Sequence, residues 1–148
     1  MLKDSVKATG KVKFVLTGED GQVKDLREVD NLVVQSGLDF IAERMKDATT
    51  NVMSHMEVGT TNTTPALGDT TLAAAVAASR TALTSTTVST DQVTYTCTFN
   101  PGVGTGALVE AGIFNASSAG DMLCRTIFAV INKGAADTLT ISWTVTIS

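Results

Sequence analysis

The chain has 148 residues, of which 43% are hydrophobic and 5% aromatic, and its formal net charge at pH 7 is −4. This length accommodates one domain with a substantial core, and the composition is that of an ordinary globular protein. The acidic balance and the lack of a Lys/Arg cluster argue against nucleic acid as a ligand, and no apolar run approaches the length of a membrane span.

The first ten residues carry no regular apolar pattern. They lead into mixed polar residues and not into the apolar core of a signal peptide, so we expect a protein made and kept in a cytosol. We predict a single domain over residues 1–148 in which residues 1–10 form an N-terminal contact arm, with Leu2 and Val6 as contact residues. The alternative is a segment that is merely mobile surface.

A hairpin and a helix are predicted next. Residues 11–16 alternate basic and apolar side chains, and residues 22–29 return after a turn at 19–21, which predicts a β-hairpin. A helix is predicted over residues 37–46, with Ser36 as its N-cap. Its apolar stripe, at three- and four-residue spacing, consists of Leu38, Ile41, Ala42 and Met45. We expect this stripe to close one end of the core; contact with a partner is the alternative.

Residues 59–69 form a polar stretch with little helix or strand character, which predicts either a functional loop or a second contact arm. The alternative is again a mobile surface segment. The following alanine-rich residues, 72–78, predict a short helix. The contact residues predicted in the loop are Thr60, Asn62, Thr64 and Pro65.

Five strands follow in quick succession, separated by turn residues. They are predicted at residues 81–88, 92–99, 108–114, 122–131 and 138–147. This spacing indicates an all-β fold, an antiparallel β-sandwich of the jelly-roll type with one short helix.

The last of these strands has the clearest alternation in the chain. Residues 138–147 place Leu, Ile, Trp and Val on one face and only Thr and Ser on the other. The second face lacks the Lys, Glu or Pro that soluble proteins use to prevent unpaired strands from joining other chains. We therefore expect a protein partner.

Few residues suit catalysis or metal binding. His55 is the sole histidine, alternates with apolar neighbours and is expected to be a packed or edge residue. Cys97 and Cys124 lie in predicted strands without metal-ligand spacing, and we expect two small buried side chains. We expect no catalytic residue, no cofactor, no metal and no small-molecule substrate.

Two further motifs have structural interpretations. The glycine run at residues 102–106 is followed by a predicted strand, whereas a phosphate-binding loop needs a following helix, so a plain loop is expected. Glu110 lies in an apolar stretch, and an outward-facing or Arg-paired carboxylate is expected, with Arg125 as a candidate partner.

Several segments together resemble a known family of proteins. They are VGT at 58–60, DTTL at 69–72, EAGIFN at 110–115, MLCRT at 122–126, INKG at 131–134, the closing strand around Trp143, NLVV at 31–34 with the following Gly37 and Leu38, and the opening hairpin. In these segments, which together span nearly the whole sequence, the chain resembles the small virion proteins of tailed bacteriophages. Members include capsid cement or decoration proteins with a jelly-roll-like β-sandwich, and related segments occur in tail-fibre and collar proteins.

The resemblance implies a structural protein and no catalytic residues. We expect a cement protein on the outer surface of a capsid, assembled in the bacterial host cytoplasm. Its expected partners are the major capsid protein and further copies of itself, as a dimer in preference to a trimer. The alternatives are a tail-fibre or collar module and a carbohydrate-binding module for host attachment.

Overall fold

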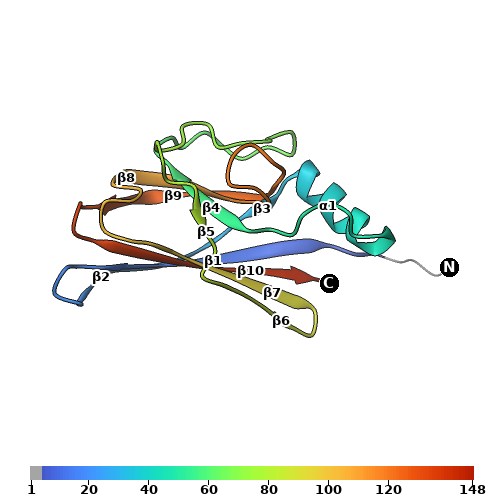
Figure 1. Ribbon diagram of the computed structural model, residues 1–148, viewed down its shortest axis with the longest axis horizontal. Helices are drawn as coiled ribbons and strands as arrows, with labels where there is room; N and C mark the ends of the chain where they lie inside the picture. Colours follow the sequence, from blue (N-terminus) through green and yellow to red (C-terminus); the bar gives the residue numbers. More distant parts are fainter. Residues whose placement is uncertain (1–4) are drawn as a thin grey trace.

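Two five-stranded antiparallel sheets face each other in the computed structural model, which describes residues 5–148 (Figure 1). Sheet A has the order β2-β1-β10-β7-β6, and sheet B has the order β3-β9-β8-β4-β5. The strands of sheet A are β1 (Ala8–Thr17), β2 (Val23–Asp30), β6 (Ser85–Ser89), β7 (Gln92–Phe99) and β10 (Thr138–Ile147). Those of sheet B are β3 (Leu32–Val33), β4 (His55–Gly59), β5 (Thr81–Ala82), β8 (Gly106–Phe114) and β9 (Met122–Lys133). One helix, α1 (Gln35–Lys46), packs on β9.

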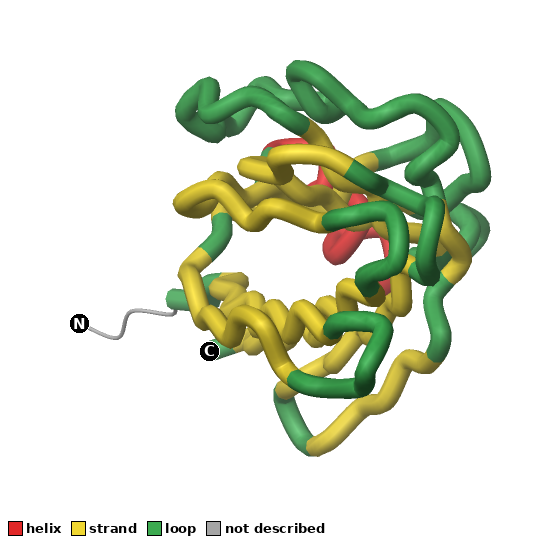
Figure 2. Tube along the Cα trace, turned by 90° about the vertical axis from the view of Figure 1, so that its left-hand side faces the viewer, coloured by secondary structure: helices red, strands yellow, loops and turns green. Residues whose placement is uncertain are grey.

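The predicted β-sandwich with one short helix is confirmed. Figure 2 shows the strands arranged in two layers, and alternating apolar residues of both sheets are buried in the core between them. On β10 the buried set is Leu139, Ile141, Trp143 and Val145, and on β1 it is Val12, Phe14 and Leu16. Of the described chain, no helix is long and apolar enough to cross a membrane.

The connections combine local hairpins with crossings between the sheets. The predicted opening hairpin is confirmed, since β1 pairs with β2, and two further hairpins, β6–β7 and β8–β9, also stay within one sheet. The chain crosses between the sheets from β2 to β3, from β5 to β6, from β7 to β8 and from β9 to β10. The first and last strands, β1 and β10, lie side by side over their whole length.

The strand predicted over residues 81–88 is in fact two strands in different sheets. β5 pairs with β4 in sheet B, and β6 pairs with β7 in sheet A. The chain changes sheet at Leu83 and Thr84, whose backbone N–H groups donate to Ser54 O (2.8 Å) and Thr96 O (2.7 Å) respectively. Alternation along a sequence cannot reveal such a change, because it indicates the faces of a strand and not its neighbours.

The helix is predicted correctly, but its N-cap and its buried face are not. The N-cap residue is Val34, while the Ser36 hydroxyl donates to Met122 O at 2.6 Å. The buried residues of α1 are Gly37 and Phe40, with Ile41 partly buried. The other residues of the predicted stripe are exposed, namely Leu38, Ala42 and Met45. The reason is Gly37, where an added Cβ would lie 2.1 Å from the carbonyl oxygen of Leu123, so that only glycine allows the helix so close to β9.

The helix predicted over residues 72–78 is absent. This stretch belongs instead to the connection from β4 to β5, residues 60–80, which we call the β4–β5 loop and which lies over the outer face of sheet B (Figure 1). Ala75 forms an isolated bridge with Gly59, and the backbone N–H groups of Ala73 and Ala74 donate to the carboxylate of Glu110. Because these backbone groups already have hydrogen-bond partners outside the segment, they are not available for the hydrogen bonds of a helix.

Candidate interaction surface

A buried ion pair fastens the β4–β5 loop to sheet B. Glu110 Oε1 accepts from Arg125 Nε (3.2 Å) and Nη2 (2.9 Å), and the two Glu110 oxygens also accept from the N–H groups of Ala73 (3.0 Å) and Ala74 (2.8 Å). Arg125 Nη1 donates to Asp69 at 3.1 Å. The predicted Glu110–Arg125 pairing is confirmed, and both side chains are also buried. The pair therefore holds a long loop in one position.

The loop predicted as a contact arm, residues 59–69, is anchored at its C-terminal half. Leu67 O accepts from Gln35 N at 2.8 Å, and Pro65 is half-buried in a small hollow that Leu32 and Arg125 also line. The N-terminal half of the loop presents its polar side chains to solvent. The predicted contact residues exposed there are Thr60, Asn62 and Thr64.

The last three residues of the segment predicted as an N-terminal arm, residues 8–10, belong to the sandwich. Strand β1 already begins at Ala8, and Lys7 exchanges two backbone hydrogen bonds with Ser148 (2.6 and 2.8 Å). Leu2 lies outside the described residues, and Val6 is 77% exposed. Because Lys7 is paired with Ser148 of sheet A while the loop covers sheet B, the structure places the described part of the N-terminal segment apart from the loop.

The outer face of sheet A carries an array of hydroxyl groups, as the alternation in the last strand predicts. In the pairing of β7 with β10, Thr98 lies opposite Thr140, Thr96 opposite Ser142 and Thr94 opposite Thr144. The Oγ1 atoms of the last pair are 3.0 Å apart. We call these residues, together with Thr146, the hydroxyl face. It ends at β1, whose Lys11 lies near two carboxylates of β2.

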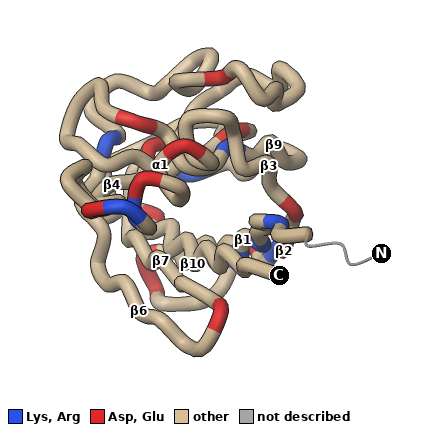
Figure 3. Tube along the Cα trace, turned by 90° about the vertical axis from the view of Figure 1, so that its right-hand side faces the viewer, with Lys and Arg blue, Asp and Glu red and all other residues tan. Residues whose placement is uncertain are grey.

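The strand edge left open by the fold is not the one expected. β10 is the central strand of sheet A, so its backbone is paired on both sides. The free edge beside the hydroxyl face is β6, which is paired only with β7 and whose five residues are all exposed. β6 contains only Ser, Thr and Val, and it lies at the lower margin of the molecule in Figure 1. Figure 3 shows β6 and β10 free of charged residues.

The opposite edge of sheet A is protected. β2 carries Lys24, Asp25, Arg27, Glu28 and Asp30 along its eight residues. Charged side chains of this kind discourage an edge strand from pairing with another chain, because the approaching strand would have to desolvate them. β6 has no such residue, so it is the strand of sheet A most open to a partner.

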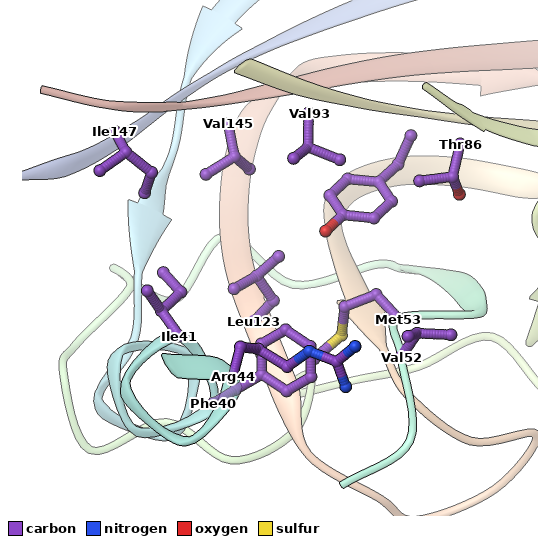
Figure 4. Close-up of a pocket in the computed structure, with 11 residues that line it drawn as sticks. Phe40, Ile41, Arg44, Val52, Met53, Thr86, Val93, Leu123, Val145 and Ile147 are labelled. Carbon is purple, nitrogen blue, oxygen red and sulfur yellow. The ribbon is translucent and has the colours of Figure 1, made fainter. Parts of the chain in front are cut away.

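An apolar pocket lies between the sheets next to β6, at the end that α1 covers. Its volume is about 430 Å³, and Figure 4 shows its walls facing one another. Sheet A contributes Thr86, Val93, Tyr95, Val145 and Ile147, and the other wall consists of Phe40, Ile41, Arg44, Val52, Met53 and Leu123. A volume in this range with mainly hydrophobic walls is typical of a binding site.

Two polar groups and one exposed side chain mark this pocket. The hydroxyl of Tyr95 is desolvated, which raises the pKa of Tyr95 to about 12. Arg44 donates to Thr50 O at 2.8 Å, and its guanidinium lies 5.5 Å from the centre of the Phe40 ring. Val52, at the rim, is 58% exposed.

His55, the residue considered for catalysis, does not line this pocket. His55 is half-buried on β4, and its Nδ1 is 2.7 Å from the Ser54 hydroxyl; burial and then the positive charge of Arg80 lower the pKa of His55. Within residues 5–148, no group of three His, Cys, Asp or Glu side chains is placed to hold a metal ion. The glycine run at residues 102–106 leads directly into β8, as predicted.

The two cysteines are free and buried, as expected. Burial raises the pKa of the Cys97 thiol to about 12, and burial also raises the pKa of Cys124. Both thiols are therefore protonated at neutral pH, which makes them poor nucleophiles and poor metal ligands.

The hydroxyl face is predictable from the sequence, whereas the edge strand and the pocket were not predicted from it. The run of Ser, Thr and Val in β6 was a possible signal for the edge, whereas nothing local indicates the pocket, whose walls come from distant segments. Comparison of the chain with protein-family models, with curated proteins and with solved structures found no match.

Proposed function

We propose that the protein is a structural virion component of a tailed bacteriophage that binds the outside of the capsid and cements its lattice. The observation that carries this proposal is the hydroxyl face of sheet A, formed by two strands, β7 and β10, that contain no charged residue. Such a face can pack against another protein without desolvating ions, and its hydroxyl groups can form hydrogen bonds with that protein. The sequence resemblance supplies the kind of partner, the major capsid protein.

A cement protein acts by mass action. Each copy that binds the assembled lattice and not the free subunits lowers the free energy of the assembled state. Such a protein requires a rigid binding surface, since ordering a mobile surface would reduce the gain. The buried anchoring of the β4–β5 loop and the paired termini of sheet A provide rigidity of this kind.

The test is the copy number of the protein relative to the major shell subunit in purified phage particles, measured by quantitative mass spectrometry. A ratio of the same order as the shell subunit is expected of a lattice cement. A few copies per particle would instead support the tail-fibre or collar alternative. Absence from the particles would overturn the virion proposal.

The carbohydrate-binding alternative has less support. Sugar-binding sandwiches use exposed aromatic side chains as platforms for the sugar ring. Here all seven aromatic residues are buried: Phe14, Phe40, Tyr95, Phe99, Phe114, Phe128 and Trp143.

A further inference from the structure

The pocket and the free strand edge are parts of one surface. Thr86 of β6 lines the pocket, so the pocket extends as far as the outermost strand of sheet A. A strand added beside β6 would therefore lie over the pocket mouth. Its inward-facing side chains would point toward Val52 and the other residues of the opposite wall.

Val88 is an apolar residue that the isolated chain leaves exposed at the free edge of sheet A. It faces inward on β6, as Thr86 does, because it pairs with Val93, a residue of the pocket wall. It is nevertheless 74% exposed, because β6 has no neighbour on its outer side. A β-branched apolar residue in this position is suited to a partner that completes the layer.

We propose that two copies of this chain pair through β6 in antiparallel orientation about a two-fold axis at Thr87, joining the two A sheets into one continuous sheet. The occupant of the free edge is thus β6 of a second copy. An isologous interface requires a self-complementary patch, and a short strand without charges meets that requirement, since no like charges oppose each other across the axis.

The register follows from the faces of the strand. A shift by one residue would set the hydroxyl side of one copy against the inward side of the other. A shift by two residues would preserve the faces but leave part of β6 unpaired. The register centred on Thr87 pairs all five residues, with Ser85 opposite Ser89 of the second copy and Thr86 opposite Val88 of the second copy.

This register also completes the pocket. Val88 of the second copy lies beside Thr86 and hence at the mouth of the pocket, and the symmetry places the first Val88 at the mouth of the other pocket. Each copy therefore contributes an apolar residue to a site that is open in the isolated chain. The inference concerns pairing in the free protein and does not depend on where the protein is located in a particle.

Disulfide trapping tests the register. In the proposed dimer the two Thr87 Cα atoms are about 4.5–5.5 Å apart, within the range that a disulfide can bridge. A Thr87→Cys variant is expected to form covalent dimers under mild oxidation, seen on a non-reducing gel. Cys97 and Cys124 are buried and contribute no background. Failure of the folded Thr87→Cys variant to cross-link would overturn the proposal.

Two neighbouring variants serve as register controls. Ser85→Cys alone and Ser89→Cys alone should remain uncross-linked, because each residue lies about 13 Å along the strand from its own copy. Mixing the two variants should give a mixed covalent dimer. Cross-linking of Ser85→Cys with itself would contradict the register.

Sedimentation tests the role of Val88. The unmodified protein is expected to sediment as a dimer, and Val88→Lys as a folded monomer, because the new charge would lie over an apolar pocket. Val23→Lys is the matched control, since Val23 is also exposed but lies on the charged edge strand β2, and it should remain dimeric. A monomeric unmodified protein at its highest soluble concentration would exclude the dimer.

Discussion

Glu110 and Arg125 show how one buried pair can position a long surface loop. Glu110 accepts hydrogen bonds from both the Arg125 side chain and the backbone of the β4–β5 loop, so each of its two oxygens has a donor. Removing one member of a buried pair leaves an uncompensated charge, which costs far more than the loss of an exposed pair such as Lys11–Glu28. The ion pair therefore fixes the position of the β4–β5 loop on the outer face of sheet B.

We predict that Glu110→Gln lowers the free energy of unfolding by about 3–5 kcal/mol, because the substitution leaves Arg125 buried with only Asp69 as a carboxylate partner. Urea unfolding at neutral pH measures the effect. Lys11→Ala, which removes an exposed cation, is the control and should change stability by less than about 1 kcal/mol. Equal losses of unfolding free energy in the two variants would show that the buried pair stabilises the fold no more than an exposed pair does.

The raised pKa of the Cys97 thiol predicts that the free energy of unfolding falls at alkaline pH. Its pKa is raised from 9.0 to about 12 in the folded state by burial. Between these values the unfolded chain loses the thiol proton and the folded chain keeps it, so the free energy of unfolding falls as pH rises. This thiol alone contributes up to about 1.4 kcal/mol per pH unit.

In Cys97→Ala, the decline of unfolding free energy above pH 9.0 should be shallower by that amount, because the unfolded variant has one thiol fewer to ionise. Urea unfolding of both proteins over a series of alkaline pH values measures the two slopes. Below pH 9.0 the two proteins should differ only by a constant offset. Parallel slopes above pH 9.0 would contradict the assigned shift.

At the scale of elements, helix α1 shows how a close backbone contact can override an apolar pattern. The spacing of Leu38 and Met45 predicts that they face the core, yet Met45 is 85% exposed. Gly37 sits directly on the backbone of β9, and the helix is therefore rotated so that Gly37 and Phe40 face inward. The steric free energy that a side chain at position 37 would cost against the β9 backbone exceeds the free energy gained by burying Leu38 and Met45 instead.

Substitutions on the two faces of α1 should differ sharply. Phe40→Ala is expected to cost about 3–5 kcal/mol of unfolding free energy, because Phe40 packs into the core beside the pocket. Met45→Ala should stay within about 0.5 kcal/mol, as expected of an exposed position. Thermal and urea unfolding of both variants provide the comparison, and a larger loss for Met45→Ala would support the rotation predicted from the sequence instead.

At the scale of the whole molecule, the pairing of β1 with β10 brings the two ends of the described chain together at one end of sheet A. The chain before Lys7 therefore starts beside the end of β10, on a different sheet from the β4–β5 loop. A partner that contacts both predicted regions would have to span the two layers of the sandwich. Contact through one region at a time is the simpler arrangement.

We predict that deletion of residues 1–6 leaves the unfolding temperature unchanged but abolishes binding to phage shells. The deletion spares β1 and the hydrogen bonds between Lys7 and Ser148, so the sandwich keeps all its strand pairs. Co-sedimentation with shells measures binding. Deletion of residues 1–10 is the structural comparison and should lower the unfolding temperature, since it removes three residues of β1. Retained binding by the shorter deletion would exclude the arm as a contact.

Much of the fold was predictable from local patterns. The alternation in β10 and the opening β-turn-β pattern identified strands, core residues and the hydroxyl face, because a strand with one buried face must alternate with a period of two residues. Glu110 was recognisable as a paired carboxylate because a charge in an apolar stretch needs a partner. The division of residues 81–88 between two sheets and the anchoring of residues 72–78 were not predictable, since both depend on hydrogen bonds to distant segments.

The sequence by itself determined the class of the fold, the faces of its long strands and the burial of both cysteines, because these depend on the order of apolar and polar residues along a short stretch. Only the tertiary structure decided which strand is central and which is an edge, which face of α1 is buried, and where the apolar pocket lies. The physical reason is that strand neighbours, helix rotation and cavities are set by contacts between residues far apart in the chain, to which a local pattern contributes only one side.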